Sequence, residues 1–179
     1  MFTQEDVFIE VIVKRKKTAK DYLIIAGLVL AFIVLMLIAL RFITYTLTFL
    51  PIIFAGGIFG LYYLITNLDR EFEYICTNGH LDIDMIIHKR RRKRQVSMPA
   101  KDMEILAPVT DDEYKVQQRN QSLKEMNLTT NTGPDGVWFF VGTYKGQRLL
   151  VTFEPTEKIL KDLKRHNPSK VKFNMIQGL

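Results

Sequence analysis

EFEYICTNGHLDIDMII, residues 71–87, decides the fold of the region around it. Apolar and polar residues alternate on both sides of Asn78-Gly79, a dipeptide with a strong preference for two-residue hairpin turns. If these two residues form the turn, one face of the hairpin is wholly apolar, with Phe72, Tyr74 and Cys76 opposite Met85, Ile83 and Leu81. The stretch therefore predicts an antiparallel hairpin that buries one face in a core.

A basic run follows at once. HKRRRKRQ, residues 88–95, holds six consecutive cations: Lys89, Arg90, Arg91, Arg92, Lys93 and Arg94. The whole chain carries a formal charge of +6, so this run alone accounts for the excess. We expect residues 89–92 to be the loop of a second hairpin, in which a third strand at residues 95–98 places Val96 opposite Met85 and Met98 opposite Ile83.

Two long apolar stretches precede the hairpin. YLIIAGLVLAFIVLMLIAL, residues 22–40, and LTFLPIIFAGGIFGLYYLIT, residues 47–66, contain no charged residue, and each is long enough as a helix to cross a bilayer core. Only residues 41–46 separate them, which predicts a tight antiparallel transmembrane hairpin. The expected organisation is an N-terminal segment at residues 1–20, a membrane hairpin at 21–68 and a β domain at 69–179.

The charges that flank the apolar stretches indicate an orientation. Five cations lie at residues 14–20 and the basic run follows the second stretch, whereas the connecting loop has only Arg41. By the positive-inside rule both termini are cytoplasmic, and the protein is a multi-pass protein of the cell membrane. A buried hairpin of a soluble protein and a signal peptide are the alternatives, but the length and number of the stretches favour the membrane. A single cysteine, Cys76, also fits a reducing compartment.

The membrane hairpin is interpreted as an anchor. Apart from Arg41, no ionisable side chain interrupts the two stretches, whereas transport pathways usually need such groups at membrane depth. Gly56 and Gly60 form a small-xxx-small pair that permits close helix packing, either within the hairpin or against a neighbouring helix.

The rest of the chain predicts more strands and one closing helix. Strands are expected at residues 103–109 and 126–130, and a hairpin at 137–144 and 147–154, all extending the sheet. A helical turn or two is expected within residues 111–120. Thr156 is a candidate cap for an amphipathic helix with Ile159, Leu160 and Leu163 on one face. Residues 7–14, VFIEVIVK, favour an added strand by their β-branched alternation, with an interfacial helix as the alternative.

This order of elements resembles the pleckstrin-homology-like (PH-like) domains of bacterial membrane proteins, in which a bent sheet is closed by a C-terminal helix. More closely, the chain is similar to an uncharacterised family of small bacterial proteins with two transmembrane helices and a domain of unknown function. The stretches that carry this resemblance are EVIVKRKKTAKDYL, EYICTNGHLDIDMIIHKRRRKRQVSM, MEILAPV and FEPTEKILKDLKRHNPSKV. The resemblance implies an α+β membrane protein, a two-helix hairpin joined to a cytoplasmic antiparallel β domain, and it implies no activity.

Strand lengths predict where the basic run lies. The first strand of the hairpin starts just after the second apolar stretch, and the second strand returns toward that level, so the run is expected at the inner membrane surface. There each cation near anionic headgroups is worth about 1 kcal/mol. The sequence therefore predicts a membrane-anchored binding or scaffold module whose residues 89–94 contact anionic lipid.

Other interpretations of the run are a solvated turn that only sets topology, and a nucleic-acid site. Nucleic acid is disfavoured because no helix-turn-helix pattern, zinc-ligand spacing or aromatic stacking surface accompanies the cations. The alternative function is an accessory subunit of a membrane complex, with contacts at Gly56, Gly60 and the loop at residues 110–136.

Catalysis, cofactors and metals find little support in the sequence. The histidines, His80, His88 and His166, share no metal-ligand spacing, and no Gly-rich phosphate loop or nucleophile motif is present. Asp82, Asp84 and Glu73 lie on the polar hairpin face, where Glu73 opposite Asp84 is unfavourable unless cations lie alongside. Cys76 falls on the apolar face and is expected in the core. We therefore expect no enzyme activity, cofactor or small-molecule substrate.

Overall fold

The computed structural model describes residues 7–42 and 47–173, and it divides into two compact units. One unit comprises residues 16–70. The other comprises the residues before position 16 together with those from position 71 onward. Each unit is described by itself.

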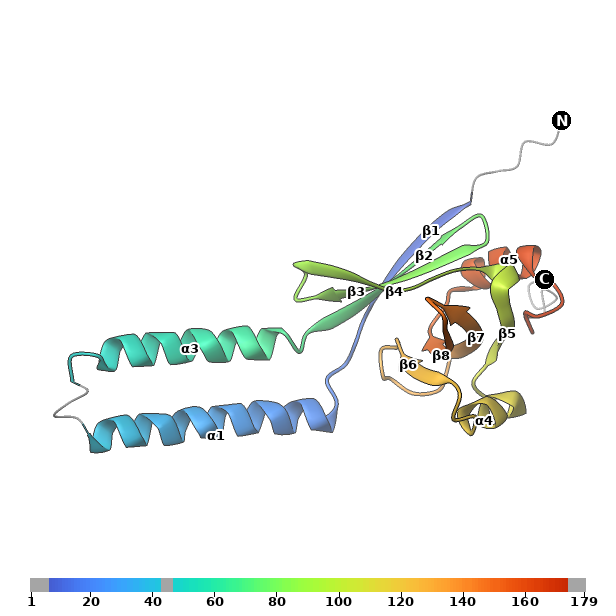
Figure 1. Ribbon diagram of the computed structural model, residues 1–179. Helices are drawn as coiled ribbons and strands as arrows, with labels where there is room; N and C mark the ends of the chain where they lie inside the picture. The colour runs from blue at the N-terminus through green and yellow to red at the C-terminus, as the bar shows by residue number, and fades with distance from the viewer. Residues whose placement is uncertain (1–6, 43–46, 174–179) are drawn as a thin grey trace. The chain divides into compact units, whose positions relative to one another are not determined.

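The first unit contains two apolar helices, α1 (Ala19–Arg41) and α3 (Leu50–Thr66) (Figure 1). Helix α1 begins with a capping box, in which Thr18 and Asp21 bond each other's main chain. It starts three residues earlier than the sequence predicts, because this box lies before Tyr22. Helix α3 starts later than expected, with residues 47–49 in a turn, because Pro51 is tolerated only in a first helical turn.

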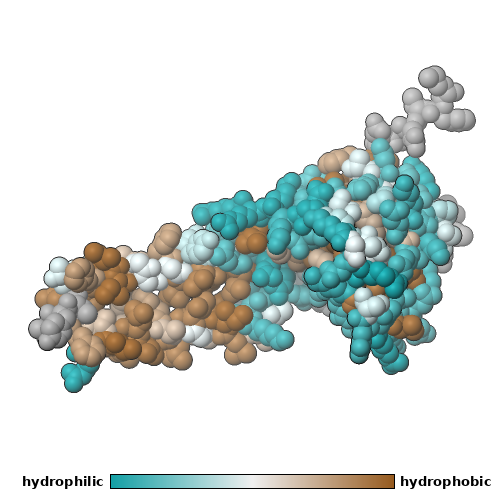
Figure 2. All heavy atoms as spheres, in the orientation of Figure 1, coloured by the Kyte–Doolittle hydropathy of each residue, from teal (hydrophilic) through white to brown (hydrophobic). Residues whose placement is uncertain are grey.

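Within the described residues, α1 alone is long and apolar enough by length and composition to cross a membrane, and α3 is a shorter apolar helix of 17 residues. Apolar side chains cover both helices (Figure 2). Only 6% of the most apolar window of α1 is buried. The two helices meet through Phe32, whose ring lies 6.3 Å from that of Phe54. A Cβ at Gly57 would lie 2.2 Å from the Phe32 ring, so this glycine permits the contact.

The second unit begins with a four-stranded sheet of order β1 (Phe8–Lys14), β2 (Arg70–Thr77), β3 (His80–Ile87) and β4 (Arg91–Pro99). The predicted hairpin is confirmed, since Asn78 and Gly79 form the turn with φ of 48° and 75°. The predicted apolar face is largely buried, with Phe72, Tyr74, Cys76, Leu81 and Ile83 at most 3% exposed. Residues 8–14 are a strand paired antiparallel with β2, which settles the ambiguity of that segment in favour of the strand.

The predicted register of the third strand is wrong. Val96 pairs with Ile83 and Met98 with Leu81, and the register shifts between Ile83 and Asp84. The loop is also shorter than expected, because β4 begins at Arg91 and only residues 88–90 form the turn. Positive φ angles of 47° at His88 and 54° at Lys89 make this tight turn possible. Most of the basic run is therefore strand, not loop.

The later strands form a separate sheet instead of extending the first. A 3₁₀ turn, η1 (Ala100–Asp102), leads from β4 into this sheet, whose order is β5 (Met103–Pro108), β7 (Trp138–Tyr144), β8 (Gln147–Phe153) and β6 (Lys124–Asn127). The β7–β8 hairpin and the strand ending at Pro108 agree with the sequence. Strand β6 starts earlier than predicted and pairs parallel with β8, so the unit is not wholly antiparallel. Helix α4 (Asp112–Gln118) provides the expected helical turns.

Helix α5 (Glu157–His166) closes the unit with the predicted apolar stripe of Ile159, Leu160 and Leu163 in the core. Thr156 stands at the N-cap position but its side chain makes no capping hydrogen bond. Asp162 on the same helix is buried and accepts a hydrogen bond from the Gly79 N–H at 2.7 Å. Helix α5 therefore lies at the Asn78-Gly79 end of the first sheet. The unit therefore has an α+β architecture in which most strands pair antiparallel.

Candidate functional site

The turn between β3 and β4 lies at a definite end of the first sheet. Antiparallel order places it at the end where β1 finishes at Lys14 and β2 starts at Arg70, opposite the Asn78-Gly79 turn (Figure 1). The turn is closed by a hydrogen bond from the Arg90 N–H to the Ile87 carbonyl at 3.0 Å. This is also the end at which the chain leaves for α1 and returns from α3.

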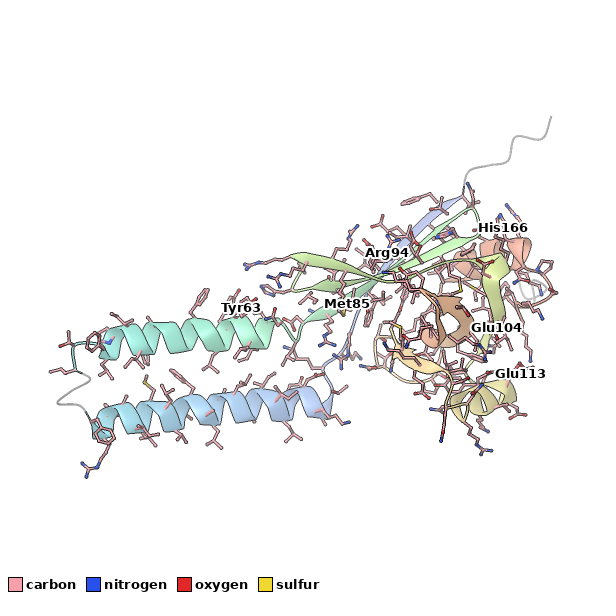
Figure 3. All side chains as sticks on the ribbon, in the orientation of Figure 1. Tyr63, Met85, Arg94, Glu104, Glu113 and His166 are labelled. Atoms are coloured by element: carbon pink, nitrogen blue, oxygen red, sulfur yellow. The ribbon has the colours of Figure 1, made fainter. Side chains whose placement is uncertain are left out.

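Two cations of the basic run are engaged in ion pairs on the face of the sheet that points away from the core. Arg92 donates a hydrogen bond to Glu73 at 2.8 Å. Arg94 pairs with Asp82 at 2.7 Å. It also bonds Asp84 through a close Nε contact and through Nη2 at 3.2 Å. Figure 3 shows Arg94 on this hairpin. The cations expected beside Glu73 and Asp84 are thus present, and they come from the same run that the sequence assigned to lipid.

The electrostatics of this face centre on Glu73, whose side chain is 0% exposed. Loss of hydration raises the pKa of Glu73 above its usual range, a hydrogen bond with Glu10 raises it further, and Arg92 partly offsets both. The pKa of Arg94 is raised chiefly by its hydrogen bonds to Asp84. These ion pairs stabilise the packing of β4 with β3 and β2. They also neutralise part of the charge of Arg92 and Arg94, so these two arginines attract an anionic ligand less strongly.

The other four cations form a surface that we call the basic tip: Lys89, Arg90, Arg91 and Lys93. All four are exposed, and within residues 7–42 and 47–173 none of them makes an ion pair with a carboxylate. Ile86 and Ile87 beside them are only half-buried. A cluster of unpaired cations beside partly exposed apolar side chains suits an anionic surface that also has an apolar layer.

The remaining polar groups that the sequence singled out bond different partners. His80 shares a hydrogen bond with the Ser97 hydroxyl at 2.9 Å, and its Nε2 lies 3.3 Å from Asp82 Oδ1. His166 shares a hydrogen bond with the Asp162 main-chain carbonyl of its own helix. No group of three or more metal-ligating side chains was found among the described residues. Cys76 is wholly buried, and burial raises the pKa of its thiol, as does the thiol's contact with Asp162 at 3.2 Å.

A polar groove of about 650 Å³ lies beside β5 and α4 and was not predicted. It is lined by side chains of both charge signs from segments far apart in the chain, among them Lys101, Asp102, Glu104, Glu113, Lys170 and Lys172. Several of these charges are already paired, as in the contacts of Lys172 with Asp111 and Glu113 at 3.1 and 3.0 Å. No local pattern could have revealed the groove, because it is assembled only by tertiary structure.

The glycines proposed for helix packing occupy a different position from Gly57. Gly56 is exposed and Gly60 half-buried, and a Cβ at either would have open space within 4 Å of the described chain. They do not make the contact between α1 and α3, which depends on Gly57.

The loop at residues 110–136 is partly ordered by Glu154, which accepts two hydrogen bonds from Thr130.

Nearly the whole chain matches one protein family. The matching family model is described as Bacterial PH-like domain (DUF6106) and covers residues 5–173. No curated protein and no solved structure matches the chain.

Proposed function

The chain belongs to this bacterial PH-like domain family, and we propose that it is a membrane-anchored binding module whose basic tip contacts anionic lipid. Membership of the family agrees with the resemblance drawn from the sequence and favours a binding or scaffold role. The observation that carries the proposal is the basic tip: four exposed, unpaired cations at the end of the sheet that adjoins both apolar helices in the chain.

Anchoring is supported by the length and exposure of the helices. At about 1.5 Å per residue, α1 spans roughly 35 Å and α3 roughly 25 Å, against a bilayer core of about 30 Å. Their apolar side chains are mostly exposed, which is costly in water and favourable in lipid. A hairpin that crosses twice places both termini on one side, and the cations at residues 14–20 favour the cytoplasmic side.

Short connections support the position of the basic tip. Residues 15–18 join β1 to α1, and residues 67–69 join α3 to β2. At no more than about 3.5 Å per residue, these links reach roughly 10 to 14 Å. The end of the sheet that carries the basic tip is therefore tethered within reach of the headgroups.

The strength of the contact follows from the number of free cations. Each Lys or Arg near an anionic surface is worth about 1 kcal/mol, so the basic tip contributes about 4 kcal/mol at low salt. Arg92 and Arg94 add less than the sequence implied, because Glu73, Asp82 and Asp84 already neutralise them.

Lysine acetylation of the full chain in lipid nanodiscs tests the contact between the basic tip and anionic lipid. Lys89 and Lys93 should react more slowly in discs with phosphatidylglycerol than in discs of phosphatidylcholine alone. Lys158 is the internal reference, because it is exposed on α5 at the opposite end of the sheet. The protection should disappear near 1 M salt, where the screening length falls to about 3 Å. Equal reaction of Lys89 and Lys93 in both lipids contradicts the proposal.

A paired variant makes the test specific to charge at the tip. R90Q/R91Q removes two cations but keeps both lysine probes, and should cost about 2 kcal/mol of docking free energy and most of the protection. The matched control R119Q/R165Q removes two exposed arginines elsewhere and should leave the protection unchanged. If both variants lose the same protection, net charge and not the tip is responsible.

An accessory role in a membrane complex is the second candidate, favoured by the open space at Gly56 and Gly60. A neighbouring helix could approach closely there. An integral partner at equal stoichiometry should copurify with the full chain in mild detergent and should be lost on Gly56→Leu. Gly27→Leu is the matched control, because Gly27 on α1 also has open space around it. A partner retained by both variants would exclude this helix face.

A further inference from the structure

The outer edge of β1 is a strand edge that the described part of the chain leaves uncovered. β1 bonds β2 on one side only and is the first strand in its sheet. On its outward face Phe8 is 65% and Ile12 54% exposed. An apolar strand edge of seven residues is a template for pairing with another strand unless something blocks it.

The other sheet edges are protected in recognisable ways. β4 carries four cations at Arg91–Arg94, and its pairing with β3 contains a register shift. β6 has only four residues. β5 is covered by residues 170–172, which hydrogen-bond the main chain of Leu106. Charge, short length and covering segments are the usual defences of sheet edges. The β1 edge has neither a proline nor a bulge, and its charges are only Glu10 and Lys14.

Backbone geometry limits how a second strand can pair there. The Val7 carbonyl accepts from the Asn78 N–H and the Val7 N–H donates to the Asn78 side chain, so both polar groups of Val7 point toward β2. Because these groups alternate along an antiparallel strand, those of Phe8, Glu10, Ile12 and Lys14 point to the free edge. Any added antiparallel strand must bond these even-numbered residues.

Side chains then select one register for self-pairing. Centring a symmetric pair on Glu10 places two carboxylates opposite each other, and centring it on Val11 places Glu10 opposite Ile12 and Lys14 opposite Phe8. Centring it on Ile12 places the two Ile12 side chains together and flanks them with two Glu10 to Lys14 pairs. Opposite charges and apolar pairs across strands stabilise a sheet, and like charges destabilise it.

We infer that β1 pairs antiparallel with β1 of a second copy of this chain, centred on Ile12. Lys14 of the second copy would stabilise the Glu10 carboxylate, because the Glu10 carboxyl lies beside the buried Glu73 carboxyl. Neither Glu10 nor Lys14 makes an ion pair with an opposite charge within the described residues, although the Glu10 carboxyl shares a hydrogen bond with Glu73. The pairing joins two four-stranded sheets into one continuous sheet of eight strands.

The pair has a consequence for the basic tips. Because the two copies of β1 run antiparallel, the joined sheet carries one basic tip at each end. The inference does not depend on lipid binding, since the strand edge and its charges are independent of the basic tip.

Disulfide trapping tests the register in full-length protein. In the pair the two Ile12 Cα atoms lie about 5.5 Å apart, within the range of a disulfide. I12C should therefore give a covalent dimer with copper phenanthroline and oxygen, either in membranes or in mild detergent. F8C lies on the same face of β1, but its two copies would be roughly 27 Å apart, so it should stay monomeric like the wild type. Cys76 is buried and does not contribute. An I12C yield no higher than that of F8C overturns the inference.

Charge reversal in the I12C background tests the flanking pairs. E10K or K14E alone places two like-charged pairs across the strands and should lower the dimer yield about tenfold, and the double variant E10K/K14E should restore it. Residues 10, 12 and 14 are all exposed, so we expect these variants to fold. Single variants that cross-link as well as I12C alone, or a double variant that fails to recover, refute the centred register.

Discussion

Replacing Arg92 by glutamine tests whether the ion pairs of β4 hold the hairpin that carries the basic tip. Arg92 is 57% exposed, but its partner Glu73 is 0% exposed and lies 2.8 Å away. An exposed pair is worth about 0 to 1 kcal/mol, and losing one partner of a buried pair costs about 3 to 5 kcal/mol. Since only one partner is buried, we expect R92Q to lower the free energy of unfolding by about 2 kcal/mol at pH 8.

The loss should depend on pH with a definite sign. The pKa of Glu73 is raised in the folded chain, so its contribution to stability is present at low pH and is lost as the pH rises through the folded value. Arg92 lowers this pKa, so R92Q raises it further and widens the window in which the folded carboxyl is protonated. The cost of R92Q should therefore shrink as the pH falls toward 4.5, the ordinary value for a glutamate.

Denaturant unfolding followed by fluorescence measures this cost in detergent. Trp138 is the single tryptophan and lies on β7, so the signal reports the β unit and not the helices. R148Q is the matched control, because it breaks an arginine pair with Glu104 in which both side chains are exposed, and its cost should be much smaller. Equal losses for R92Q and R148Q, or an R92Q cost that stays constant between pH 8 and 4.5, would refute the assigned role of Glu73.

Three further predictions concern the core. Gly79→Ala should destabilise the β unit far more than Gly146→Ala. Both glycines have φ near 75°, but a Cβ at position 79 would lie 2.2 Å from the His166 ring, whereas a Cβ at position 146 would have open space. Tyr74→Phe should cost about 1 to 2 kcal/mol, measured by the same unfolding assay, because the hydroxyl donates to a buried carbonyl. Cys76 should resist a maleimide reagent until the chain unfolds, since its thiol is buried and its pKa raised; mass spectrometry of labelled protein would detect an exception.

Local sequence patterns predicted those elements whose turns are determined by neighbouring residues. Asn78-Gly79 placed the β2–β3 hairpin correctly, and alternating apolar residues around Lys145-Gly146 did the same for β7 and β8. Helix α5 was found from its apolar stripe. In each case the residues that decide the structure are within a few positions of one another.

The same reasoning failed where distant segments decide the outcome. The shift between Ile83 and Asp84 changes the register of β4, and nothing in its own residues reveals it. The parallel pairing of β6 with β8 and the separation into two sheets depend on how strands pack across long connections. The contact of Gly57 with Phe32 likewise joins two helices, and the spacing of Gly56 and Gly60 did not reveal it.

The amino-acid sequence alone determined that this chain combines apolar helices with a PH-like β unit and that its excess positive charge sits in one run, because composition and short-range periodicity are properties of neighbouring residues. Tertiary structure alone decided which of those cations are free. Strand pairing brought Glu73, Asp82 and Asp84 beside Arg92 and Arg94 and left Lys89, Arg90, Arg91 and Lys93 exposed, and charge pairing across strands depends on a register that no single strand encodes.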